Sequence, residues 1–203
     1  MFTASRMLLL LLITAMILGS CEGDTGTAAH AASVSITDRW HFRKYLEDPQ
    51  IPEKAKQVFN DQRRLEDAEL PFYISHLQSS NQEEHAFYFR VITNSYNKKG
   101  IRVPEGLANA AYRYVMNNPA EFADYFAGPD AFTDADLTTW SDLVIVELER
   151  MTEDQYGRPV IETYLDSLEG NCHNANAQQQ RILRRFGRHL TEGWQRYLMN
   201  VEQ

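Results

Sequence analysis

Basic residues are scarce in this chain: 20 lysines and arginines stand against 28 aspartates and glutamates, which gives a net charge of −8. A body with this balance repels phosphate backbones, so nucleic acid is excluded as a partner class. Anionic lipid headgroups do not attract such a surface either. Any attachment to a membrane must therefore come from something other than a basic face.

The sequence also lacks the short motifs that mark common catalytic and cofactor sites. None of its six histidines falls in a His-Glu-x-x-His motif or pairs with cysteine at zinc spacing. A Gly-x-Ser-x-Gly elbow, a Gly-rich phosphate loop, a dinucleotide fingerprint and a Cys-x-x-Cys-His haem motif are absent as well. We therefore expect no metal site, no cofactor and no catalytic residue of these classes.

Long hydrophobic runs are limited to one, from Met7 to Leu18, which only Thr14 interrupts. As a helix this run would be about 18 Å long, well short of the ~30 Å hydrocarbon core of a bilayer. Arg6 supplies a positive charge just before it. The run is therefore predicted to be the apolar part of a secretory signal peptide and not a membrane span.

The signal ends in Leu18-Gly19-Ser20-Cys21, an aliphatic residue, two small residues and a cysteine. This segment resembles the lipobox of bacterial lipoproteins, and the resemblance covers about the first 21 residues. It implies cleavage between Ser20 and Cys21 and a diacylglyceryl group on the thiol of Cys21, which anchors the protein in a membrane. Two or three acyl chains make a stable anchor, at about 0.8 kcal/mol per buried CH₂. The alternative is an ordinary signal peptide that ends near a cysteine.

Cleavage at this site leaves a mature chain with 19 basic and 28 acidic residues, a net charge of −9. With Cys21 lipidated, Cys172 has no partner for an internal disulfide. We expect Cys172 to be buried and inert, the alternative being an intermolecular bond. Glu22 follows Cys21 where, in the best-known sorting rule of lipoproteins, Asp would retain the protein in the inner membrane. The resemblance thus favours the outer membrane, with the body facing the periplasm or the cell surface.

The remaining chain divides into a tether and a body. Residues 22–35 are rich in Gly, Ala, Ser and Thr without apolar periodicity, so they are predicted to form a flexible tether of roughly 20 Å. The predicted organisation is a signal peptide over 1–20, a lipidated tether over 21–35 and a single helical domain over 36–203.

Apolar residues in the body recur at helical spacing. Helix-start signals stand at Pro52, Pro71, Asn81, Pro104, Thr133 and Pro159. The helix that begins near Pro52 is predicted to continue through Leu65, and the clearest apolar stripe runs from Ile182 to Val201. About eight or nine short helices predict an all-α fold, an irregular multi-helix bundle. The alternative is a stack of αα-hairpins, as in solenoids.

Four arginines form the local exception to the acidic composition: Arg181, Arg184, Arg185 and Arg188. Their spacing of three or four residues places them on one face of the last helix. Two interpretations stay open, a solvated helix face and a docking face for an acidic protein or an anionic glycan.

Two further clusters have a structural and a functional interpretation. Asp130, Asp134 and Asp136 precede or begin a helix, where acids cap helices; their spacing does not fit a calcium loop, so capping is preferred. Phe87-Tyr88-Phe89 cannot all face one core from a single helix, so at least one of them is expected to be exposed or to lie between helices.

These observations predict a membrane-anchored envelope lipoprotein that binds a protein partner or scaffolds a complex. An envelope enzyme acting on glycan or peptide is the first alternative. A solute-binding or immunity lipoprotein is the second. The sequence does not separate the three.

Overall fold

The computed structural model describes residues 40, 42–96, 102–128, 132–154 and 160–201. All of them belong to one unit, residues 36–203, which is separate from residues 1–35. The predicted signal peptide, the cleavage site between Ser20 and Cys21 and the tether lie outside the described residues. Within the described ranges, no helix has the length and apolar character to cross a membrane.

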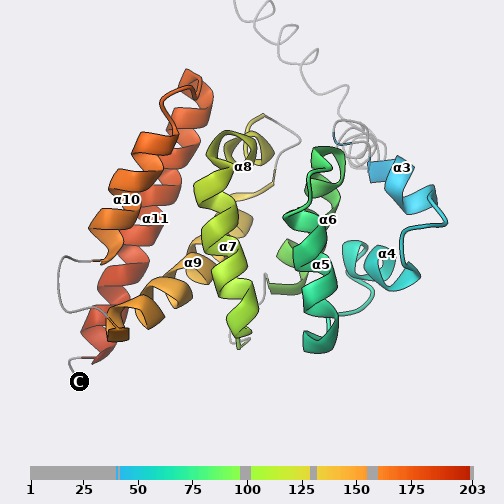
Figure 1. The fold of residues 1–203 in the computed structure, drawn as a ribbon, viewed down its shortest axis with the longest axis horizontal. Helices are drawn as coiled ribbons and strands as arrows, with labels where there is room; N and C mark the ends of the chain where they lie inside the picture. Colours follow the sequence, from blue (N-terminus) through green and yellow to red (C-terminus); the bar gives the residue numbers. More distant parts are fainter. Residues whose placement is uncertain (1–39, 41, 97–101, 129–131, 155–159, 202–203) are drawn as a thin grey trace, which may run out of the picture. The chain divides into compact units, whose positions relative to one another are not determined.

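The described residues form nine α-helices and one short 3-10 helix, and no strand occurs among them (Figure 1). The all-α prediction is therefore confirmed. In chain order the elements are α3 (Phe42–Glu47), α4 (Glu53–Phe59), η1 (Asp67–Glu69), α5 (Leu70–Leu77), α6 (Gln82–Tyr96), α7 (Glu105–Asn117), α8 (Pro119–Tyr125), α9 (Asp134–Asp154), α10 (Val160–Asn171) and α11 (Ala177–Val201).

Local signals explain where several helices begin. Pro104 is the N-cap of α7, and Asn81 precedes α6 with its side-chain amide donating to Oε1 of Glu84 at 2.8 Å. Before α9, the backbone N–H of Thr133 donates to Oδ2 of Asp136, while the N–H of Asp136 donates to Oγ1 of Thr133. This reciprocal cap satisfies backbone donors that the first turn of a helix leaves free. The preferred capping role of Asp136 is thus confirmed.

One predicted helix end is wrong. The apolar spacing after Pro52 predicts a helix that continues through Leu65, but α4 ends at Phe59. Asp61 follows with a φ of 55°, in the left-handed region that a right-handed helix cannot include. The chain turns there and Leu65 enters the core from a loop.

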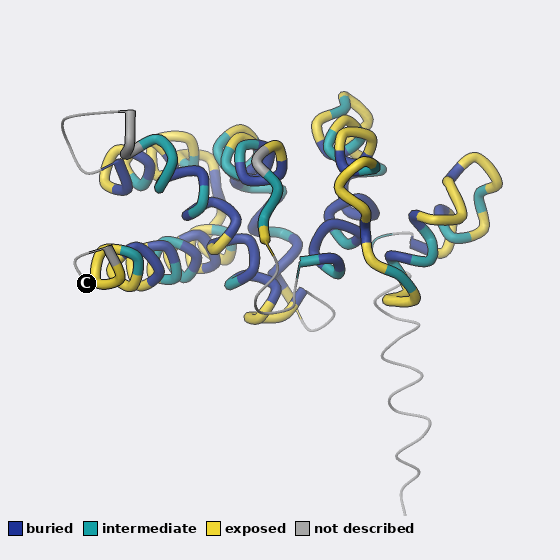
Figure 2. Tube along the Cα trace, turned by 90° about the horizontal axis from the view of Figure 1, so that it is seen from below, coloured by how far each residue is buried: buried dark blue, intermediate teal, exposed yellow. Residues whose placement is uncertain are grey.

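The helices pair along the chain as antiparallel hairpins that lie side by side. α5 packs on α6, α7 on α9 and α10 on α11, with the short α8 joining α7 to α9. Between hairpins, α5 contacts α7 and α7 contacts α10, while α6 contacts α9 and α9 contacts α11. Figure 2 shows the resulting two rows of helices, with the buried residues between them. The predicted all-α multi-helix bundle is therefore confirmed, and helices that follow one another along the chain pack together within it.

Aromatic side chains fill the centre of the stack. Trp140 of α9 is fully buried and stacks on Phe89 of α6, with ring centroids 4.1 Å apart. Its indole N–H donates to Oγ1 of Thr93 at 2.9 Å, so the buried nitrogen is satisfied. Phe87 and Tyr88 are buried as well, because α6 is packed between α4, α5 and α9. The prediction that one of the three consecutive aromatics lies between helices agrees with this packing.

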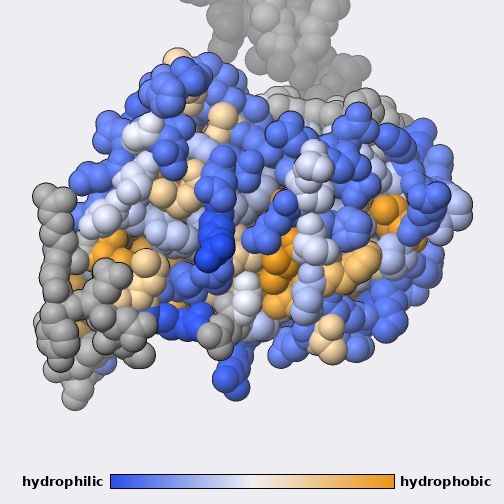
Figure 3. All heavy atoms as spheres, in the orientation of Figure 1, coloured by the Kyte–Doolittle hydropathy of each residue, from blue (hydrophilic) through white to orange (hydrophobic). Residues whose placement is uncertain are grey.

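The outer surface is mostly polar. Figure 3 shows polar side chains over most of one face, with apolar side chains visible where neighbouring hairpins meet. The large hydrophobic residues that are exposed among those described are Phe72, Leu198 and Met199. Scattered apolar residues of this kind are normal on a globular surface, so a functional site has to be sought in the hollows and the charged faces.

Candidate functional site

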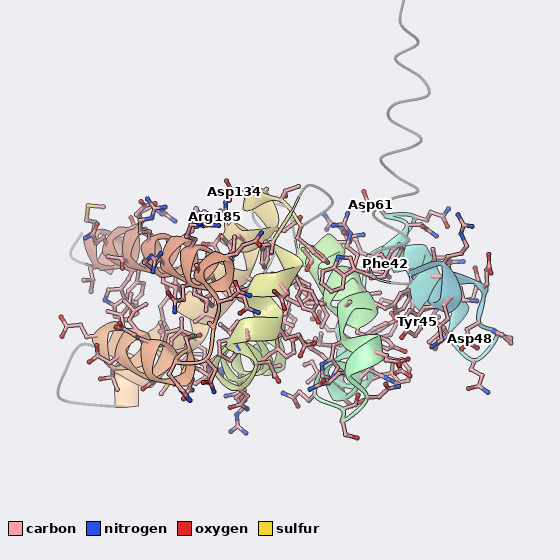
Figure 4. The ribbon with its side chains drawn as sticks, turned by 90° about the horizontal axis from the view of Figure 1, so that it is seen from above. Phe42, Tyr45, Asp48, Asp61, Asp134 and Arg185 are labelled. Carbon is pink, nitrogen blue, oxygen red and sulfur yellow. The ribbon has the colours of Figure 1, made fainter. Side chains whose placement is uncertain are left out.

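Three of the four arginines predicted as a partner-binding face are exposed on α11. Arg181, Arg184 and Arg188 form no ion pair with another described residue. Arg185 is half-buried, and its Nε lies 3.1 Å from Oδ1 of Asp134 at the start of α9 (Figure 4). The first three, which we call the arginine face, present their charges to solvent, while Arg185 ties α11 to α9.

Two hollows lie along α11 beside the arginine face, one of about 960 Å³ and one of about 490 Å³. Leu165, Arg184 and Gly187 line both of them, so the two are continuous, and we call them together the α10–α11 groove. The groove is lined on α10 by Leu165, Leu168 and Glu169, and just after the end of α10 by Cys172. These positions are three or four residues apart and therefore form one stripe along the helix.

The charge along the groove is positive on balance. Glu169 and Glu192 are the acidic residues that line it, against the three exposed arginines and the paired Arg185. The chain as a whole is strongly acidic, so this concentration of positive charge runs against its composition. A surface of this kind attracts an anionic partner and steers its approach.

Cys172 lies in the groove as a half-buried free thiol. Burial raises the pKa of this thiol, which keeps it protonated and a poor nucleophile. The neighbouring His173 uses Nδ1 to donate to the carbonyl of Gly170 at 3.0 Å, and its Nε2 faces the amide of Asn174 at 3.0 Å. Both ring nitrogens are occupied, so His173 is not placed to activate the thiol.

A second concave feature, which the sequence did not reveal, surrounds Glu121 of α8. His85 of α6 is buried, with Nδ1 2.9 Å from Oε1 of Glu121 and Nε2 2.8 Å from the carbonyl oxygen of Ser79. The hydroxyl of Tyr125 donates to the same Oε1 at 2.6 Å, and the hydroxyl of Tyr114 lies 2.9 Å from that of Tyr125. The network joins α6, α7 and α8.

The positions of the hydrogen atoms in this network follow from which of its atoms can only accept a hydrogen bond. A carbonyl oxygen only accepts, so Nε2 of His85 carries a hydrogen that it donates to Ser79. The contact between Nδ1 and Glu121 then requires a second proton, on one of these two atoms. Tyr125 gives its hydrogen to Glu121, so Tyr114 must donate to Tyr125. Each of these polar atoms has a partner, as a stable buried network requires.

A hollow of about 700 Å³ opens next to this network, and we call it the Glu121 hollow. Its lining includes Trp40 and Tyr45 together with three acidic residues, Glu83, Glu121 and Asp124. Each carboxylate is already bonded to the protein. Glu83 accepts from Nζ of Lys44 at 3.1 Å and Asp124 accepts from the side-chain amide of Gln179 at 3.0 Å. Each of the three carboxylates of the hollow therefore has at least one partner within the fold.

Residues of the types that bind metals are not grouped together in the described part of the chain. No group of three or more His, Cys, Asp or Glu side chains there comes together in a way that could hold a metal ion. Of the three aspartates considered for calcium, Asp134 pairs with Arg185 and Asp136 caps α9. Asp130 lies outside the described residues. Comparison with known proteins gives no match: no family model, no curated protein and no solved structure is significantly similar to this chain.

One sequence signal could have identified His85 as a buried hydrogen-bonding residue. His85 stands four residues before Phe89, and seven before Ile92, on the stripe of α6 that enters the core. A histidine at such a position needs buried partners for both ring nitrogens. Its partner Glu121 lies 36 residues further along the chain, so only the packing of α8 against α6 identifies the pair.

Proposed function

We propose that this chain is a lipid-anchored envelope lipoprotein whose helical body binds an acidic protein partner through the arginine face of α11. The anchor in this proposal rests on the lipobox-like residues that end at Cys21. The observation that carries the binding role is the set of three exposed guanidinium groups that form no ion pair with another described residue, on a chain with an excess of acidic residues. Charges that the fold does not pair are available to a partner.

The α10–α11 groove and the Glu121 hollow differ in how well they support this binding role. The groove offers unpaired cations next to apolar side chains, the combination found at protein-binding surfaces. The Glu121 hollow contains carboxylates that are already bonded, which gives less support to acid–base catalysis on a glycan or peptide. Binding is therefore preferred over the enzymatic alternative.

Crosslinking on intact cells tests the binding role. The triple variant Arg181→Glu, Arg184→Glu, Arg188→Glu should lose a crosslinked partner by about tenfold or more, because like charges then face each other across the interface. The matched control is Arg43→Glu, Arg64→Glu, Arg113→Glu, which changes the net charge equally at exposed positions elsewhere. The control should crosslink as the wild type does. Equal crosslinking by both triple variants, or no partner in the wild type, would overturn the proposal.

Mass spectrometry of the mature N-terminus tests the anchor. The protein purified from membranes should begin at Cys21, with acyl groups on that residue. Cys21→Ser should carry no acyl group and should not be cleaved at the same bond, since the thiol is the acyl acceptor in the resemblance. Identical processing and membrane retention of the Cys21→Ser protein would show that the lipobox interpretation is wrong.

A further inference from the structure

The α10–α11 groove has the length of a short helix. Its lining on α11 extends from Gln180 to Gln195, which is about 23 Å at 1.5 Å per residue. The groove is also open to solvent along α11 and not closed around a small cavity. An extended polypeptide element of three to four turns fits such a surface better than an enclosed small molecule, which usually has most of its area buried.

The floor of the groove is apolar while its rim is cationic. Leu165 and Leu168 of α10 face Leu183 of α11 across the floor, and Cys172 continues the α10 stripe. The arginine face lies along the same groove. A polyanion would use only the arginines and a neutral apolar helix only the floor. An amphipathic helix with acidic residues beside its apolar stripe satisfies both.

Gly187 gives the groove its depth at the point where the two hollows join. It lies in the middle of α11, a 25-residue helix, where glycine is less stable than alanine by about 0.5–1 kcal/mol. A Cβ atom at this position would lie 3.4 Å from Cδ2 of Leu165, so alanine fits, whereas a longer side chain would fill the floor. The missing side chain leaves room for one from a partner.

From the apolar floor, the cationic rim and the gap at Gly187, we propose that the occupant of the groove is an acidic amphipathic helix of a partner protein. This inference rests on the proposed function and adds the chemistry of the partner. Apolar side chains of the helix lie over Leu168 and Leu183, and its carboxylates pair with Arg181, Arg184 and Arg188. Arg181, Arg184 and Arg188 are exposed where they line the groove, so the site is accessible.

Fluorescence anisotropy on the detergent-solubilised mature protein tests the inference with three synthetic probes. The first is a peptide of about 18 residues with leucines at helical spacing and glutamates beside them. The second has the same composition in a scrambled order, and the third is polyglutamate. The first peptide should bind about tenfold more tightly than the other two, and it should slow the alkylation of Cys172.

Three glycine substitutions test the shape of the groove without changing its charge. Gly187→Met keeps all charges but fills the floor, so it should weaken binding of the first peptide by about tenfold. Gly106→Met on α7 is the matched control, because Gly106 is exposed and a Cβ atom there would lie 4.0 Å from its nearest neighbour, Cδ1 of Ile74. The control should bind as the wild type does. Gly187→Ala, which leaves the floor open, should also bind, and circular dichroism of Gly187→Met should show the helix content of the wild type, so that its loss of binding is not caused by unfolding.

The outcomes distinguish this inference from the proposed function. If all three probes bind equally and Gly187→Met has no effect, the groove recognises charge alone; the helix inference is then wrong while the arginine face stands. The same holds if no probe binds although crosslinking in cells depends on the arginines. If crosslinking is also independent of the arginines, both proposals fall.

Discussion

The Glu121 hollow and the α10–α11 groove are both concave and both charged, yet they use their charges differently. In the hollow, Glu121 is bonded to two neighbouring side chains, and Asp124 accepts a hydrogen bond from Gln179. In the groove, the three guanidinium groups of the arginine face have no ionic partner among the described residues. Charge that is paired and buried holds helices together, whereas charge that is unpaired and exposed is available for binding.

The largest expected effect is a loss of folding stability at alkaline pH. Tyr114 and Tyr125 lie beside the hollow, and burial raises the pKa of each hydroxyl well above the ordinary tyrosine value of 10. Burial also raises the pKa of Tyr96, to about 12. The unfolded chain ionises its tyrosines near pH 10 and so holds fewer protons than the folded chain above that pH. The stability from these neutral tyrosines is complete below pH 10 and is lost as the pH rises toward about 12.

Circular dichroism and phenolate absorbance, followed together during an alkaline titration, check this expectation. Helix content should fall cooperatively above about pH 10, and the phenolate signal of the buried tyrosines should appear with it. No tyrosine lines the groove in the described part of the chain, so the groove does not contribute. Full tyrosine ionisation while the helix content remains native would contradict the assignment of these side chains to a dry core.

The next largest effect should come from breaking the network with Glu121→Gln. The amide oxygen can still face both the imidazole of His85 and the hydroxyl of Tyr125, but it lacks the negative charge of the carboxylate, so both bonds weaken and the free energy of unfolding should fall by about 2–3 kcal/mol. Glu83→Gln is the matched control in the same hollow. The Glu83 side chain is 76% exposed and pairs with Lys44, and its loss should cost at most about 0.5 kcal/mol. Urea unfolding measures both, and equal small losses would mean that the network does not hold α6 to α8.

A smaller effect distinguishes two glycines of α11, one on each side of the helix. A Cβ at Gly193 would overlap Cδ1 of Ile145 on α9, so Gly193→Ala should lower the free energy of unfolding by about 1 kcal/mol. Gly187→Ala faces the open groove and should raise it by about 0.5–1 kcal/mol through helix propensity. Thermal unfolding of the two variants should therefore move in opposite directions. A shift of the same sign would show that Gly187 is packed as tightly as Gly193.

The smallest effect on folding stability is expected from substitutions in the arginine face. Replacing Arg181, Arg184 and Arg188 by glutamate removes no ion pair with a described residue, so the free energy of unfolding should change by about 0.5 kcal/mol or less. Urea unfolding beside the Arg43, Arg64, Arg113 control measures this. A loss of several kcal/mol would give the arginines a structural role and would weaken the binding proposal.

The sequence predicted those features of the fold that depend on neighbours along the chain. Pro104 and the Thr133–Asp136 pair mark helix starts because capping needs only residues within one turn. The end of α4 was missed because Asp61 takes a left-handed conformation, which is unusual for a residue other than glycine.

Features that depend on contacts between distant segments were not predictable. Arg185 shares the spacing of its three neighbours, but α9 brings Asp134 to it and removes it from the exposed face. The bond between His85 and Glu121 likewise depends on how α8 packs on α6. Helical spacing identifies which residues share a face, and only the packing decides which of those faces remain free.

The most direct test of the central claim is the alkylation rate of Cys172 in intact cells, read by mass spectrometry and compared with the purified protein. If a partner occupies the α10–α11 groove, Cys172 should react several-fold more slowly in cells than after purification, and this protection should disappear in the Arg181, Arg184, Arg188 triple glutamate variant but not in the Arg43, Arg64, Arg113 control. Equal rates in cells and in the purified protein, or protection that survives the loss of the arginine face, would contradict the claim.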